Sequence, residues 1–238
     1  MPRRNALIAS IEPALWDQFQ DRFMPLEIEG GSTLHQAGEE LAHVQFPTTA
    51  VVALGVETLA GESVNVALLG PEGAVGVFEA CGSRRMYHSA SVQFAGTLWQ
   101  AATGVYRELY GASPALRSAV HKYTETLMVE MRQNVACNAL HTVENRLART
   151  LLEAMDKFGS ARLPITQGAL AHLLGVQRTT VASAISALQR SGCVRTGRGG
   201  GVEVLDARTL ALAACSCRES LAFVRQEIQS RDLAICDA

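Results

Sequence analysis

The chain has 238 residues and a mass of 25.5 kDa; 48% of its residues are hydrophobic and 18% are charged. This composition excludes a disordered chain, a collagen-like fibre and a charged tail protein, and the length suits two modest domains better than one. The formal net charge of −2 excludes a strong whole-molecule field that would attract nucleic acid or membrane.

Charge is unevenly distributed along the chain. Residues 1–138 contain nine Lys and Arg against fourteen Asp and Glu, whereas residues 139–238 contain twelve against nine. Residues 157–202 contain six basic residues and no acidic one. A basic segment confined to one half of a chain is the electrostatic footprint of nucleic-acid binding.

The six cysteines are scattered and form no CxxC motif, which indicates reduced thiols rather than a disulfide framework. Cys215 and Cys217 are the only close pair. In a C-terminal helix two such side chains point about 200° apart, so the pair alone predicts no metal site and its role stays open. The N-terminal segment has no apolar signal core, and no run approaches about 18 apolar residues. We therefore expect a cytoplasmic protein that has no membrane partner.

The first two predicted segments differ in the spacing of their apolar residues. Apolar residues at helical spacing predict one short helix over residues 6–23, which ends before Pro25. From residue 26 to about 103, short apolar runs alternate with glycines, and residues 51–56, 64–69 and 89–94 are predicted strands. Turn signals about ten residues apart favour an antiparallel barrel or sandwich.

A long helix is predicted over residues 113–138. Ser113 is a suitable N-cap, and Pro114 fits the first helical position. An apolar stripe then repeats every three or four residues. Its members are Leu116, Val120, Tyr123, Leu127 and Met131. So narrow a stripe over about three heptads predicts a homodimer seam; the alternative is a helix lying on its own barrel.

The chain after the long helix begins with a predicted hinge at residues 138–142. Thr142 can cap the next helix, with Glu144 in its first turn. The predicted division is therefore residues 1–112 as an antiparallel β domain, 113–138 as a long helix that would pair two copies of the chain, and 139–238 as a second domain.

Residues 165–192 carry the strongest motif. Thr166 can cap a short helix, and Gly175 suits the left-handed conformation of a turn. A second helix follows with Val181, Ile185 and Leu188 on its inward face. Two short helices joined by a glycine turn predict a helix-turn-helix, and the glycine-rich hairpin at 193–205 predicts a wing beside it.

The outward side chains of this motif are uncharged or cationic hydrogen-bonding groups, which suit base edges and phosphates. Arg178 is the predicted principal contact to DNA. The full set of candidate DNA-binding residues is Thr166, Gln167, Gln177, Arg178, Thr179, Thr180, Ser183, Ser186, Arg195 and Arg198.

The sequence resembles the Crp/Fnr family of bacterial transcription regulators over nearly its whole length. Residues 31–39 and 69–76 resemble the family's barrel motifs, residues 143–152 resemble the helix after the hinge, and the helix-turn-helix and wing follow in order. The resemblance implies an α+β chain with an N-terminal antiparallel β jelly-roll of cyclic-nucleotide-binding type, a long dimerisation helix and a winged helix-turn-helix. It implies double-stranded DNA, a second copy of the chain and RNA polymerase as partners, and no enzymatic activity.

The resemblance also implies an effector pocket in the barrel. The candidate residues are Gly73, Val75, Gly76, Val77, Arg84, Arg85, Met131 and Arg132. Members that bind cyclic AMP have Gly-Glu-Leu in this pocket and an arginine that pairs with the phosphate. This chain has Gly-Val-Phe at 76–78, and its arginines are offset by several residues. Ordinary cyclic AMP is therefore not expected. A constitutive regulator with a degenerate, ligand-free barrel is the alternative to one with another, unknown effector.

The sequence also lacks the signatures of other cofactors found in the family. No cysteine precedes Cys81 to hold an iron–sulfur cluster. The barrel histidines His35, His43 and His88 are expected to be ordinary polar residues rather than haem ligands. A metalloenzyme is the remaining alternative, with His35, Glu39, Glu40 and His43 as its nearest candidate cluster. Base readout should differ from that of the best-known member, which presents Arg-Glu-Arg where this chain has Arg178, Thr179 and Ser183.

Overall fold

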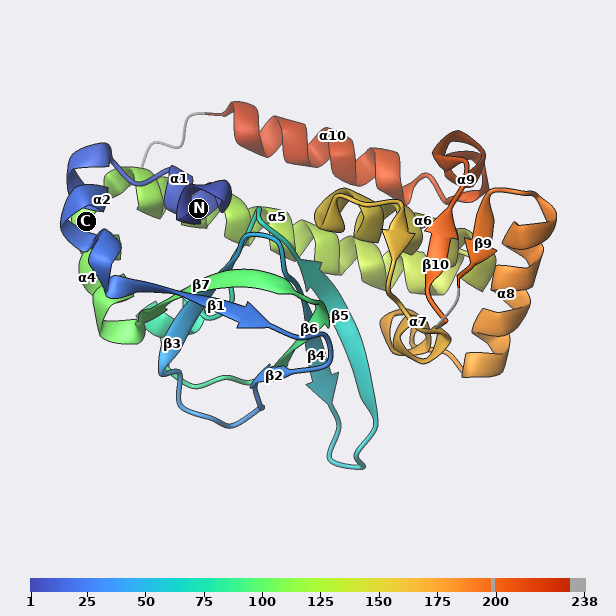
Figure 1. Cartoon of the computed structure of the whole chain (residues 1–238), viewed down its shortest axis with the longest axis horizontal. Helices are drawn as coiled ribbons and strands as arrows, with labels where there is room; N and C mark the ends of the chain where they lie inside the picture. Colours follow the sequence, from blue (N-terminus) through green and yellow to red (C-terminus); the bar gives the residue numbers. More distant parts are fainter. Residues whose placement is uncertain (198–199, 232–238) are drawn as a thin grey trace.

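The computed structural model describes residues 1–197 and 200–231. Its N-terminal part contains two antiparallel sheets with strand orders β1-β7-β3 and β2-β6-β4-β5, which enclose one apolar core (Figure 1). The strands are β1 (Phe23–Ile28), β2 (Thr33–His35), β3 (His43–Pro47), β4 (Val51–Glu57), β5 (Ser63–Leu69), β6 (Ser89–Phe94) and β7 (Gly96–Ala102). The three strands predicted from sequence correspond to β4, β5 and β6, and the antiparallel barrel is confirmed.

Alternate side chains of β4 face two different cores. Val52 and Leu54 point into the barrel interior, whereas Val51 and Ala53 pack with residues of the C-terminal part. A strand buried on both faces needs a continuous apolar run, and β4 has one. The outer face of the four-stranded sheet is therefore the surface on which the C-terminal part sits.

The predicted single helix over residues 6–23 is wrong. The segment instead forms two α-helices, α1 (Ala6–Ala9) and α2 (Pro13–Phe19), and Phe23 already begins β1. Pro13 is the cause, because proline has no N–H for a helix interior but fits the first position of a new helix. Asn5 caps α1 by accepting the N–H groups of Leu7 and Ile8.

Three further helices belong to this part of the chain. The first lies between β5 and β6, the other two follow β7, and the last of them is the long helix predicted from sequence. They are α3 (Val77–Cys81), α4 (Thr103–Ala112) and α5 (Pro114–Leu140). Ser113 caps α5 as expected, with its Oγ accepting the Leu116 N–H at 3.0 Å. Because α5 continues to Leu140, the predicted hinge at 138–142 shrinks to His141 and Thr142.

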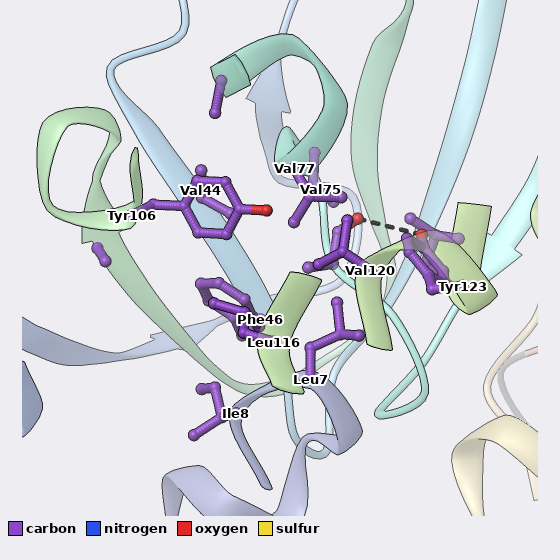
Figure 2. Packing of buried hydrophobic residues seen from close by; sticks show 14 of the residues in the cluster. Leu7, Ile8, Val44, Phe46, Val75, Val77, Tyr106, Leu116, Val120 and Tyr123 are labelled. Atoms are coloured by element: carbon purple, nitrogen blue, oxygen red, sulfur yellow. Dashed lines mark hydrogen bonds between the residues drawn. The ribbon is translucent and has the colours of Figure 1, made fainter. Parts of the chain in front are cut away.

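The apolar stripe of α5 faces the barrel of its own chain. Figure 2 shows Leu116, Val120 and Tyr123 pointing into the barrel core, and these residues and Leu127 are only 1–6% exposed. Met131 packs beside them, partly buried. The predicted homodimer seam therefore needs correction: the stripe binds α5 to its own barrel, which was the alternative interpretation.

The C-terminal part is mainly helical and contains a small antiparallel sheet of order β8-β10-β9. Its elements are α6 (Val143–Phe158), β8 (Arg162–Leu163), α7 (Gln167–Leu174), α8 (Arg178–Arg190), β9 (Val194–Thr196), β10 (Val202–Val204), α9 (Ala207–Ala213) and α10 (Cys217–Ser230). Thr142 caps α6 as predicted, accepting the Asn145 N–H. Among the described residues, no helix combines the length and apolarity needed to cross a bilayer.

The last helix, α10, returns alongside α5 (Figure 1). Its Leu221 and Ile228 are buried, and Arg225 pairs with Glu130 of α5 at 2.6 Å. Lys122 of α5 donates to the backbone carbonyl of Gln229 at 3.0 Å. The chain therefore leaves the barrel along α5, forms the small C-terminal domain and comes back to α5.

Candidate DNA-binding interface

Helices α7 and α8 form the predicted helix-turn-helix. The Oγ of Thr166 accepts the Ala169 N–H at 3.1 Å and so caps α7. Gly175 ends α7 with φ of 61°, the left-handed conformation that favours glycine. The inward side chains of the two helices are at most 3% exposed. They are Leu170, Leu174, Val181, Ile185 and Leu188.

The outward face of α8 is open to solvent. Its exposed residues are Gln177, Arg178, Thr179, Thr180, Ser183 and Ser186. Arg178 is the first residue of α8, and within the described residues its side chain makes no hydrogen bond or ion pair. The hydroxyl of Ser186 donates to the carbonyl of Ala182 at 2.9 Å. A base or phosphate can therefore engage the guanidinium of Arg178 without breaking a contact that the described structure holds.

The wing holds a charged triad that the sequence did not indicate. Glu203 on β10 accepts from Arg195 at 2.5 Å and from Arg162 on β8 at 3.1 Å. These hydrogen bonds hold the pKa of the Glu203 carboxyl below its usual value. Arg162 was missed as an interface residue, although it lies in the basic segment. Arg198 falls outside the described residues.

Helix α8 and the wing are joined by a side-chain hydrogen bond. Gln189 of α8 donates to the hydroxyl of Thr196 on β9 at 2.9 Å. The other candidates lie at the start of α7, where Thr166 is exposed and Gln167 is partly buried. The described candidates therefore lie on α7, on α8 and on the adjoining wing, where a duplex could contact all three.

Comparisons with known proteins agree with this arrangement. Residues 145–213 match the Crp-like helix-turn-helix domain. The C-terminal part of the chain therefore contains a helix-turn-helix domain of the Crp type. Helix-turn-helix domains of this kind bind DNA. A search of the curated proteins found no match to this chain.

Solved structures share the fold of this chain over most of its length. FixK2 from Bradyrhizobium japonicum has a TM-score of 0.69 at 14% identity, covering 81% of this chain and 98% of that one. A putative Crp/Fnr regulator from Eubacterium rectale has a TM-score of 0.68 at 16% identity, covering 91% and 99%. The regulator CLP from Xanthomonas campestris, described as responsive to c-di-GMP, has a TM-score of 0.67 at 15% identity, covering 82% and 100%.

The predicted effector residues of the chain lie in packed surroundings. Val75 and Val77 are 1% exposed and belong to the barrel core. At Gly73 a Cβ would come within 2.3 Å of the Tyr123 ring, and at Gly76 within 2.7 Å of Leu41. Tyr123 also donates to the Ala74 carbonyl at 3.1 Å, the dashed line in Figure 2. The two glycines therefore let this loop close tightly on α5 and on Leu41.

The remaining candidates for the pocket do not converge with these. Arg84 and Arg85 are exposed, and Arg85 donates to the Gly38 carbonyl at 2.9 Å. Met131 is partly buried and Arg132 is exposed on α5. None of the eight candidates lines the three cavities described below. Their assignment to an effector therefore stays a prediction.

Three cavities lie elsewhere. One of about 920 Å³ lies between α1, α5, α6 and α10, and one of about 670 Å³ lies beside the wing. The third, of about 540 Å³, opens on the barrel next to His35, Glu39, Glu40 and His43. His35 is hydrogen-bonded to the Gln45 carboxamide at 2.8 Å. In the described part of the chain these four residues do not gather closely enough to share an ion.

Proposed function

We propose that this regulator acts as a homodimer that binds a palindromic site in double-stranded DNA, with α8 of each protomer in the major groove. The exposed face of α8 carries the proposal, with the guanidinium of Arg178 at its start, which has no partner in residues 1–197 and 200–231. Gln177, Thr179, Thr180 and Ser183 lie around that cation and would adjust base preference. The hydrogen bond between Gln189 and Thr196 would bring the wing to the phosphates flanking the groove.

The dimer seam is proposed on the free face of α5 rather than on its barrel face. Here solvent-facing residues recur at alternating intervals of four and three. They are His121, Glu125, Met128, Arg132 and Val135. Met128 is 46% exposed and Val135 is 71% exposed, which is unusual for apolar side chains arranged in line on one helix. Such a stripe is the pattern by which two helices pair in a coiled coil.

The signal that controls the regulator is not proposed to be cyclic AMP. The acidic acceptor expected at position 77 is a valine in the core, and the two arginines of the loop lie at the surface. An effector of another kind, bound in the barrel, would act by preferring one arrangement of α5 and the hinge. RNA polymerase is the further partner that the family resemblance implies.

A constitutive regulator is the second candidate, and the packing around Gly73 and Gly76 favours it. With Tyr123 and Leu41 against these glycines, the barrel needs no ligand to fill that region. Titrating candidate nucleotides against DNA affinity separates the two cases. A nucleotide that changes the affinity supports a working sensor, and uniform affinity across the nucleotides supports the constitutive form.

Selection of bound sequences from a random duplex library tests the central proposal. We expect an inverted repeat whose half-sites are centred about 34 Å apart, one helical turn, because two-fold related recognition helices must meet successive major grooves. Binding that is independent of sequence, or a single half-site without symmetry, would contradict a dimeric reader.

Glu203→Gln should strengthen DNA binding. The change removes one negative charge per wing and frees Arg195 and Arg162 from a shared carboxylate. We expect affinity to rise about threefold to tenfold, and the dependence on salt to steepen by up to about one released counterion per freed arginine. Filter-binding or fluorescence titrations at several salt concentrations measure both quantities.

The matched control is Glu219→Gln, which removes an exposed carboxylate from α10, away from the wing. It should leave both affinity and salt dependence unchanged. Equal gains from the two variants would mean that net charge alone is responsible, and the wing would then have no special place in the interface.

A further inference from the structure

Four side chains of the types that serve as metal ligands meet at the junction of α5, the hinge and α10. They are Cys137, His141, Cys215 and Cys217, and their ligand atoms all lie within 4.8 Å of one another. The Sγ atoms of Cys137 and Cys215 are 3.5 Å apart, and the Sγ of Cys217 is 3.5 Å from Nδ1 of His141. The three cysteines are 0–7% exposed and form a small cluster of their own.

The local backbone explains why the four residues converge. Cys137 lies in the last turn of α5, and His141 is the extended residue that follows the helix; the His141 N–H donates to the Cys137 carbonyl at 3.1 Å, which keeps the two residues together. Cys215 lies in the linker after α9, whereas Cys217 is the first residue of α10. The sequence-based objection that two helical cysteines point about 200° apart fails here, because only one of the pair is helical.

The donor set is that of a single thiophilic ion. Three sulfurs and one imidazole nitrogen match the Cys₃His sites in which Zn²⁺ is held tetrahedrally. Zn–S bonds of about 2.3 Å place the sulfurs of a tetrahedron about 3.8 Å apart, close to the observed 3.5 Å between Cys137 and Cys215. Donor atoms gathered within 4.8 Å of one another leave room for one ion and not for a multi-iron cluster.

The surroundings supply positive charge and a hydrogen-bond donor. Arg146 and Arg149 of α6 are 6% and 7% exposed, and the Nε of each is buried without a partner among the described residues. Three thiolates around a divalent cation carry one net negative charge. Arg149 also pairs with Glu153 at 3.5 Å, so the two guanidiniums and this carboxylate together supply one net positive charge to balance it. The Nε2 of Gln133 donates to the Sγ of Cys217 at 3.1 Å, a contact that favours a thiolate.

We propose that Cys137, His141, Cys215 and Cys217 form a binding site for one divalent cation of the zinc class, which fastens the hinge to the start of α10. The site ties the end of α5 to the chain that leaves the DNA-binding domain. Its occupancy would then fix the angle at which α8 is presented. This last, regulatory step rests on the proposed DNA-binding function; the metal site itself does not.

The decisive experiment is a titration of the full-length, reduced and chelator-treated protein with Co²⁺, a spectroscopic substitute for Zn²⁺. We expect one Co²⁺ per chain, with the absorption bands of a tetrahedral thiolate site, and displacement of the cobalt by Zn²⁺. Absence of these bands from the folded wild-type protein overturns the proposal. A Cys137–Cys215 disulfide that resists the reductant, detected by mass spectrometry in protein that takes up no metal, overturns it too.

Variants localise the site. Cys215→Ser and Cys217→Ser should each weaken Co²⁺ binding at least about tenfold, and His141→Ala should shift the bands by replacing a nitrogen ligand. Cys81→Ser and Cys193→Ser are the matched controls and should bind like the wild type. A wild-type spectrum in the Cys217 variant contradicts the assignment.

DNA affinity measured with and without bound Zn²⁺ tests the regulatory step separately. We expect a change of at least about tenfold between the two forms, and equal affinity overturns the regulatory step. Because the metal count does not depend on DNA, it can succeed where the proposed function fails, and the two failures are distinguishable.

Discussion

Replacing Arg178 with alanine should abolish sequence-specific DNA binding while leaving the protein folded and dimeric. The side chain is exposed at the start of α8 and has no partner within the described residues, so its removal leaves no unsatisfied group. A good arginine contact to a base is worth about 1–3 kcal/mol, and a dimer loses two of them. The affinity for the selected site should fall by roughly 30-fold to 10⁴-fold.

The control for lost charge is Arg208→Ala, an exposed arginine on α9. It should lower specific and non-specific affinity by the same small factor. Comparison of the selected site with a scrambled duplex then shows what Arg178 does. If Arg178→Ala weakens both duplexes equally, Arg178 contacts phosphate; if it weakens neither, α8 is not the recognition helix.

The elements predicted correctly from sequence are those with local signals. Ser113 and Pro114 mark the start of α5, and Thr166 and Gly175 bound α7, because capping and left-handed turns depend on a few neighbouring residues. The strands β4, β5 and β6 were found from apolar runs between turns for the same reason. The failed prediction over residues 6–23 was also local, since Pro13 marks the beginning of a second helix.

The features that could not be predicted depend on contacts between segments that are far apart in the sequence. The apolar stripe of α5 indicates that this face of the helix is buried, but it does not indicate whether the barrel or a second chain buries it. The Cys₃His cluster joins residues 78 positions apart in the chain, Cys137 and Cys215, which no spacing motif describes. The wing triad is similar, because Glu203 meets Arg162 only when β8 pairs with β10.

Val135→Glu, on the free face of α5, should strongly weaken the proposed dimer. If Val135 lies in the seam, the two-fold axis brings the new carboxylate close to its own copy in a desolvated interface. An unpaired buried charge costs on the order of 3 kcal/mol, which is about 100-fold in the dimer dissociation constant. Met128→Glu, two helical turns earlier on the same stripe, should act in the same direction.

Sedimentation equilibrium measures the dissociation constant, and Leu59→Glu is the matched control because Leu59 is fully exposed in the β4–β5 connection. The control should remain dimeric. The monomeric Val135→Glu variant should also lose affinity for the palindrome, because the two recognition helices are no longer linked and the second no longer binds at a high effective concentration. It should still bind one half-site weakly through an intact α8. Dimers that survive both seam variants would show that α5 pairs through another face, or that the protomers associate elsewhere.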